Sequence, residues 1–536
     1  MNSPELTLPR PDDDVHIRGA LGTLRGGQLT GSGRRRPLRR LLAFLAIMGP
    51  GIIVMVGDND AGGVTTYAQA GQAYGVSLLW LFPILLVVLY VAQEMVARLG
   101  AVTGVGHGTL LRARFGRFWA TFSVFDLFVL NFLTLLTEFI GIDLGFRFFG
   151  ISPLVSVPVA CVVMGSVVLA RQFYRWEQVM LALILVSLLV FPMALLTPIQ
   201  WGPTLRATVV PGVQGGLTTT AMIFVIGIVG TTIAPWQLFF QQGSVVDKRI
   251  SARFANYARV DTLAGSVLTN LAGAAFVVAG AFAFLHTPMA GGEANALGLA
   301  HGFAHYVRPL MGRLFAILLL EGSLIGAATV TLASSYAVGE LFGVNSSLNA
   351  RFAEAKGFYS SYLVSVVLAG GIVLLPHLPL GLVNLGVQVL AGILLPSALG
   401  FLVLLCNDRE LLGPWVNAPW LNVLATLIVG LLLQLSLVLT VATIWPSVDV
   451  TSLALLSGIP VLGATAGVAV AQRRTAGRWR ADPAVLARRG DWTPAPGVLD
   501  HPLPKSRGRS LSLGAMRAYL VVAMVLMVVS FARLAH

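Results

Sequence analysis

Charged residues are scarce in this sequence. Asp, Glu, Lys and Arg make up 11% of its 536 residues and hydrophobic residues 56%, whereas ordinary soluble domains carry about 25% charged residues. A soluble protein this apolar could not cover its surface with polar groups, so the composition excludes a nucleic-acid-binding module and a disordered protein. The apolar residues form continuous runs of about 20, which predicts membrane-spanning helices and excludes an outer-membrane barrel, whose strands alternate.

Cysteine is almost absent. Cys161 and Cys406 are the only two, and each lies inside or at the end of an apolar run. A secreted disulfide framework and a cysteine-based metal motif are therefore both excluded. We also expect no signal peptide, because the polar N-terminal lead is too long and the first apolar run exceeds the length of an h-region.

The apolar runs predict thirteen spans, at 42–71, 75–97, 118–145, 153–171, 177–199, 217–242, 260–285, 313–341, 359–377, 381–405, 419–445, 452–471 and 516–534. If the Arg-rich N-terminus is cytoplasmic, the loops after even-numbered spans are the basic ones, and the opposite loops hold few Lys or Arg. This alternation follows the positive-inside rule. It predicts a multi-pass protein of an inner or plasma membrane.

The order of the spans and the basic segments suggests a division of the chain. We expect a disordered basic cytoplasmic tail, two five-span repeats, spans 11 and 12, an Arg-rich cytoplasmic loop and a further possible span, at 1–40, 41–199, 213–405, 419–471, 472–515 and 516–536. The tail and the segment 472–518 hold 18 of the 36 basic residues. We therefore expect anionic lipid as a partner, no nucleic acid, and a monomer.

Two spans are interrupted at their midpoints. The first contains the stretch from Gly57 to Gly63, and the sixth contains Gly230-Thr231-Thr232-Ile233-Ala234-Pro235. Gly, Asp and Pro break helices, and irregular backbone in a membrane is tolerated only where protein or a water-filled cavity surrounds it. Because the breaks occupy corresponding places in two five-span halves, they predict an inverted-repeat transporter with its site at the midplane.

Asp60 lies within the first break, where an intramembrane carboxylate costs about 2.5–3.5 kcal/mol on insertion scales. We interpret it as a cation ligand, and the alternative is a structural partner for backbone N–H groups at the break. Asp58, two residues earlier, adds charge to the site or faces a vestibule.

The stretch from Asp60 to Gly71 resembles the Nramp divalent-metal transporter motif D-P-G-N-x-x-S-D-x-Q-A-G. The stretch from Ala234 to Gln241 resembles the family's M-P-H-N-L-F-L-H, and Gln388 matches a polar position of the tenth span. The resemblance covers roughly residues 40–405. It implies an all-α, LeuT-type 5+5 inverted repeat with broken helices 1 and 6, here followed by two or three extra C-terminal spans.

The departures from the family pattern concern the metal ligands. The resemblance keeps the ligating Asp as Asp60, but the family's Asn falls on Gly63 and its Met on Ala234. Because a thioether favours transition metals over Mg²⁺, its loss relaxes that discrimination, and two lost side chains leave a larger cavity. We therefore expect transport of Mg²⁺, with Mn²⁺ as the close alternative, as in an Nramp-related magnesium transporter branch. The metal is the substrate, and no cofactor is expected. The remaining candidate ligands are Gly57, Thr231, Thr232, Gln237 and Gln388.

The proton machinery implied by the family is also altered. Its two span-6 histidines fall on Trp236 and Gln241, and an acid of span 3 falls on Leu135, while Glu138 is retained. We therefore expect transport without obligate proton coupling. Glu138 is either a carboxylate of the ion or proton pathway or a packing residue paired with Thr134.

Three alternatives stay open at this point. The first is a proton-coupled Mn²⁺/Fe²⁺ symporter of the Nramp type. The second is an amino-acid or polyamine transporter on the same fold. Asp60 would repel the carboxylate of an amino acid, whereas a polyamine would tolerate Asp60 and could use Trp236 as an aromatic wall. A membrane-embedded aspartyl protease needs paired carboxylates, and we expect no enzyme because the G-x-G-D pattern is absent.

Overall fold

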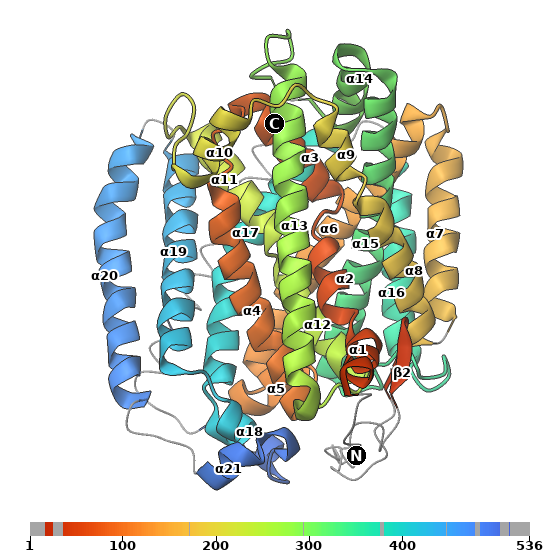
Figure 1. Cartoon of the computed structure of the whole chain (residues 1–536). Coiled ribbons are helices and arrows are strands. Elements are labelled where there is room, and N and C mark those ends of the chain that lie inside the picture. The colour runs from red at the N-terminus through yellow and green to blue at the C-terminus, as the bar shows by residue number, and fades with distance from the viewer. Residues whose placement is uncertain are drawn as a thin grey trace.

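Long apolar segments in a membrane must satisfy their own backbone hydrogen bonds, and this favours helices. The computed structural model describes residues 17–24, 36–170, 172–292, 294–375, 380–445, 448–476, 483–503 and 514. Its long helices run side by side along one direction, and the hairpin, α5, α18 and α21 lie at one end of this bundle (Figure 1). The only described strands form an N-terminal hairpin, β1 (Ile17–Gly19) and β2 (Gly22–Leu24).

The helices follow the predicted spans closely. The first half of the chain contains α1 (Arg36–Ile47), α2 (Pro50–Val56), α3 (Ala61–Tyr74), α4 (Leu81–Thr103), α5 (His107–Phe115), α6 (Arg117–Phe148), α7 (Pro153–Leu169), α8 (Phe173–Ser187), α9 (Val190–Leu195) and α10 (Trp201–Val209). The second half contains α11 (Thr219–Thr232), α12 (Pro235–Asp247), α13 (Ala255–Phe284), α14 (Ala296–Tyr306), α15 (Pro309–Phe342), α16 (Lys356–Val373) and α17 (Leu380–Cys406). Then come α18 (Arg409–Leu412), α19 (Pro419–Ile444), α20 (Val450–Ala476) and α21 (Pro483–Ala487). Short 3-10 turns are η1 (Ala252–Phe254), η2 (Gly413–Trp415), η3 (Arg489–Asp491) and η4 (Val498–Asp500).

Ten helices of the described chain are long and apolar enough to cross a membrane, counting α8 with α9, α11 with α12, and η1 with α13 as single spans. The apolar α7 is shorter, and the pair α2 and α3 forms the interrupted first span. The predicted spans up to residue 471 therefore all have helical counterparts. The division into two repeats stays a prediction, and the possible span 516–536 lies outside the described residues.

The interrupted helices lie in the centre of the bundle. The span formed by α11 and α12 is 94% buried, whereas α20 at the edge is 6% buried. Around the centre, α13 packs on α2, α3 and α4, α15 packs on α6, and α11 packs on α17. The two breaks are thus enclosed by protein rather than exposed to lipid.

Local chemistry explains where the central helices stop. Gly49, with a φ of 147°, separates α1 from α2, so the predicted span 42–71 is divided at two places. Asp261 of α13 accepts from the backbone N–H groups of Gly49 and Gly51, at 3.3 and 2.7 Å, and so satisfies the otherwise unpaired start of α2. In the second break, Ala234 is extended and Pro235 begins α12, because proline needs no N–H partner at a helix start.

The expectation of disorder across residues 1–40 is wrong for the hairpin and for the start of α1. Ile17 and Leu24 pair across the hairpin and are both buried, and β1 and β2 pack on α1. The N–H of Ala20 in the turn donates to Glu177 Oε2 at 2.7 Å. Composition indicated disorder, but two apolar side chains and one carboxylate partner are enough to hold this short hairpin.

The Arg-rich segment predicted as a loop at 472–515 has structure in its described part. Residues 483–503 fold as α21, η3 and η4 at the same end of the bundle as the hairpin (Figure 1). The buried Arg114 of α5 donates to Asp408 Oδ2 at 2.6 Å and to the carbonyl oxygens of Val498 and His501. This segment is therefore attached to the ends of the helices.

Candidate metal site

Asp60 is placed by the start of α3. It is the N-cap residue of that helix, and its Oδ1 accepts from the N–H of Gly63 at 2.7 Å. Only 3% of its surface is exposed. Asp60 is therefore a partner for a backbone N–H group at the break, as the alternative interpretation expected. This bond fixes the carboxylate and uses one of its two oxygens.

Glu138 of α6 lies beside the same break. Its Oε2 accepts from the N–H of Ala61 at 3.0 Å, the first residue of α3. The pairing with Thr134, which was the alternative to a pathway role, is not seen, and the Thr134 hydroxyl donates to the carbonyl of Leu130. A Cβ placed on Gly326 of α15 would lie 2.7 Å from both Asp60 Cβ and Glu138 Oε2. Asp60 and Glu138 therefore share one wall of the site.

A chain of amides joins Asp58 to α4. The Gln237 amide of α12 donates to Asp58 Oδ1, and the Gln93 amide donates to Gln237 Oε1 at 2.7 Å. Asp58 Oδ2 has no described partner. Gln93 was not among the predicted site residues, although a glutamine inside an apolar run was the signal that could have identified it.

The threonines at the end of α11 differ in their roles. The Thr232 hydroxyl lies 2.7 Å from Tyr67 OH and donates to the carbonyl of Ile228, so its bonding capacity is used. The Thr231 hydroxyl is buried and has no described partner, and it would lie 3.0 Å from a Cβ on Gly63. Thr231 is therefore the better ligand candidate of the two.

The tenth span also reaches the break. Gln388 of α17 lies against Gly62, and its Nε2 is buried without a described partner. Two further oxygens, the carbonyls of Gly57 and Asp58, accept from no described donor. The structure thus brings Gln388 and Gly57 to the region of Asp60, as the sequence predicted.

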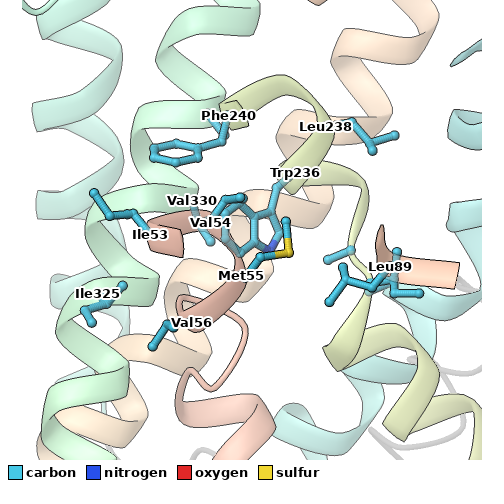
Figure 2. Packing of buried hydrophobic residues seen from close by; sticks show 14 of the residues in the cluster. Ile53, Val54, Met55, Val56, Leu89, Trp236, Leu238, Phe240, Ile325 and Val330 are labelled. Atoms are coloured by element: carbon cyan, nitrogen blue, oxygen red, sulfur yellow. The ribbon is translucent and has the colours of Figure 1, made fainter. Parts of the chain in front are cut away.

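Three other predicted positions have contacts away from Asp60 or lie buried in hydrophobic packing. Gln241 donates to the Thr262 hydroxyl of α13 at 2.8 Å. Trp236 is 1% exposed, and its ring centroid lies 6.1 Å from that of Phe240. Figure 2 shows the indole among buried hydrophobic side chains of α2, α12 and α15. Ala234 is buried at the start of α12.

The expectation of a roomier cavity is wrong at Gly63. A Cβ added there would contact the carbonyl oxygen of Asp58 and the Thr231 hydroxyl. The backbone of the first break and the end of α11 occupy the space that a side chain would take. The position therefore supplies close packing rather than volume.

The oxygen atoms that remain available at the site determine which ions it can bind. Buried polar atoms almost always have partners, so the unpartnered oxygens of Asp58 and Thr231 suggest a bound cation. Among the residues described, no three His, Cys, Asp or Glu side chains converge where they could hold a metal ion. A cation here would take most of its ligands from neutral oxygens, which suit Mg²⁺, Ca²⁺ and Mn²⁺.

Two helices broken opposite each other around buried oxygens place the chain among the membrane transporters with a midplane site. The sequence profile of the Natural resistance-associated macrophage protein-like (Nramp) family matches residues 51–442. The chain therefore belongs to the Nramp transporter family, which sets aside the enzyme alternative.

Curated relatives and solved structures agree with this membership. The divalent metal cation transporter MntH of Verminephrobacter eiseniae is 28% identical over 431 residues, which is 77% of this chain and 92% of the relative. MntH of Bacillus subtilis is 26% identical over 431 residues, or 77% and 95% of the two chains. The Eremococcus coleocola manganese transporter, solved with an aromatic bis-isothiourea compound, has a TM-score of 0.62 at 19% identity and covers 88% of this chain and 100% of its own. This likeness confirms the predicted fold class.

Gly326→Ala tests the shared wall of the site. The new Cβ has no room beside Asp60 and Glu138, and overpacking costs about 1–3 kcal/mol. We expect this cost to destabilise the metal-bound state, so that the affinity for Mn²⁺ drops by about tenfold or more. The measurement is the free Mn²⁺ signal in electron paramagnetic resonance with purified protein. Gly371→Ala is the control, because a Cβ there meets nothing within 4 Å. Equal affinities would contradict the site.

Proposed function

We propose that this protein transports divalent metal cations across the membrane by alternating access, with the ion held between the two breaks. The observation that carries the proposal is the group of buried, unpartnered oxygens around Asp58 and Thr231. Family membership and the printed function of the MntH relatives support it. A polyamine is the weaker substrate, because Trp236 lies in the hydrophobic core and offers no aromatic wall to a ligand at Asp60.

For the metal, we place Mn²⁺ first and Mg²⁺ second, which reverses the order expected from the sequence. The structural relative is a manganese transporter, and the roomy cavity that favoured a hydrated Mg²⁺ is missing at Gly63. Mg²⁺ sheds its water reluctantly, so a tightly packed site handicaps it. The donors are nevertheless all oxygens or amides, so we expect Mg²⁺ to compete more strongly than it would at a sulfur-containing site.

For the orientation, we propose a cytoplasmic N-terminus in an inner or plasma membrane. The support is the distribution of Arg and Lys between the loops. The hairpin, α5, α18 and the segment 483–503 then all lie at the cytoplasmic end. We also expect the protein to be a monomer.

Uptake into proteoliposomes tests the function. Asp60→Ala should reduce Mn²⁺ uptake to the background of empty vesicles, because it removes the charged ligand and the α3 cap together. Asp449→Ala is the matched control, since Asp449 is exposed at the start of α20. Both proteins must be recovered in equal, monodisperse amounts. Normal uptake by Asp60→Ala would refute the site, and no uptake of any divalent ion by the native chain would refute the function.

Ala234→Met tests which ions the site selects. Ala234 is buried at the start of α12, and a thioether there would add a soft ligand. We expect Cd²⁺ uptake to rise relative to Mn²⁺ by about tenfold, and Mg²⁺ competition to weaken. Competition of each ion against labelled Mn²⁺ measures this. An unchanged order of the three ions would show that Ala234 does not face the ion path.

We further propose that membrane potential drives uptake without obligate proton cotransport. The side chains at the two histidine positions are committed elsewhere, with Gln241 on Thr262 and Trp236 in the core. A potential of 100 mV is worth about 2.3 kcal/mol per charge, or about 4.6 kcal/mol for a divalent ion. That supports an accumulation of about 2,000-fold.

The coupling test records internal pH during Mn²⁺ entry at a fixed negative potential. We expect no acidification beyond the leak of protein-free vesicles. Glu138 is a carboxylate beside Asp60 that is placed to carry a proton. Acidification that follows metal entry and disappears in Glu138→Gln would overturn uncoupled transport and establish the proton-coupled alternative.

A further inference from the structure

A second polar cavity lies far from the metal site, at the end of the bundle that carries the hairpin. It has a volume of about 330 Å³, which is within the range of small-molecule sites. Four separate elements line it: β1, the start of α8, the end of α12 and the loop between α15 and α16. The hairpin lies outside the part of the chain that the family profile matches, residues 51–442.

Two of the charged groups that line the cavity, Lys248 and Asp247, already have hydrogen-bond partners. The Lys248 ammonium donates to Glu177 Oε1 at 2.6 Å and to the carbonyl oxygens of Ile47 and Met48. Asp247 accepts from Tyr336 OH at 2.8 Å and the Leu348 N–H at 2.9 Å, and also from Ser347 and Asn349. Glu177 therefore balances the Lys248 charge, whereas Asp247 remains an anion whose two oxygens are both occupied by hydrogen bonds.

Two arginines that line the same cavity have no acidic partner among the residues described. Arg18 of β1 stacks on the Tyr174 ring, with its guanidinium carbon 3.8 Å from the ring centroid. That stacking leaves the in-plane N–H groups available. Arg249 follows α12 and is exposed. Two guanidinium forks around one cavity match the geometry of a phosphate group.

The backbone at Arg249 adds an independent observation. Its φ is 60°, a left-handed conformation shared by only one other described non-glycine residue, His286. Its N–H donates to the carbonyl of Val246, and the next N–H donates to Val245, which is the usual glycine position at a helix end. Arg249 thus occupies a backbone position that favours glycine, and this points to a function for its side chain. Gln172, which also lines the cavity, has a buried Oε1 without a described partner, and this oxygen can accept from a ligand hydroxyl.

The surroundings indicate where the phosphate comes from. The hairpin packs on α1, and Leu41 and Leu42 of α1 are 53% and 52% exposed. Exposed leucines on a helix with basic neighbours are typical of a helix at a membrane surface. We propose that the cavity binds a phosphate bearing neighbouring hydroxyls, held by Arg18 and Arg249, and that an anionic lipid headgroup supplies it. This inference does not depend on the transported ion.

Arg249→Gly is the sharpest variant, because glycine favours the observed backbone while the charge is lost. Full-length protein is delipidated in detergent and titrated with phosphatidylglycerol, and bound lipid is counted by native mass spectrometry alongside thermal unfolding. We expect native protein to bind one lipid tightly and to unfold at higher temperature with it. Arg249→Gly and Arg18→Gln should each weaken this binding by at least about tenfold, with Arg249→Gly no less stable than native protein without lipid.

The control is Arg112→Gln, an exposed arginine on α5 at the same end, which should bind lipid as the native protein does. Glycerol phosphate separates the two sources. If it alone stabilises the native protein at concentrations similar to the lipid, and Arg249→Gly abolishes the effect, the site is confirmed but its ligand is soluble, and the lipid assignment is overturned. If phosphatidylglycerol acts equally on native protein and both variants, or if neither phosphate binds, the site itself is overturned. A loss of stability in Arg249→Gly without a change in lipid binding would assign Arg249 to the helix end alone.

Discussion

Backbone that leaves the helix inside a membrane must find hydrogen-bond partners within the protein, and two such interruptions lie at the centre of this molecule. In the first span, carboxylates accept from the N–H groups at the helix starts, and two of these carboxylates come from other helices. Asp261 of α13 accepts from the start of α2, Glu138 of α6 accepts from the start of α3, and Asp60 accepts within α3 itself. The positions of α6 and α13 are therefore tied to the breaks, and the rest of the bundle packs around these two helices.

The same constraint accounts for the small residues around the breaks. Gly326 lets α15 approach Asp60 and Glu138, and Gly230 of α11 lies against the backbone of α17 near Gln388. Such approaches enclose the irregular backbone, but they also leave almost no exposed surface on Asp60. An ion cannot reach a carboxylate so enclosed by diffusion through a fixed channel. Packing of this kind requires the helices to move, which is the physical basis for the alternating access that we propose.

The sequence predicted what depends on local chemistry. Helix-breaking residues located both breaks, and Asp60, Glu138 and Gln388 were visible as polar groups within apolar runs. It failed where the answer depends on which helix faces which. The use of Gln93 as the partner of Gln237, the turn of Gln241 toward Thr262 and the filled space at Gly63 all arise from packing between distant spans. The hairpin was missed because only two apolar residues stabilise it.

Gln237 shows how one neutral side chain serves a site that must both hold a cation and change shape. As described, its NH₂ group donates to Asp58 and its oxygen accepts from Gln93. A cation at Asp58 would repel that NH₂ group, whereas the carbonyl oxygen of the same amide is a good ligand for it. Turning the amide over would exchange the two ends and change the bond to Gln93 of α4, while α12 stays packed on α4. The neutral amide can thus offer a donor to Asp58 when no cation is bound and an oxygen to the cation when one is.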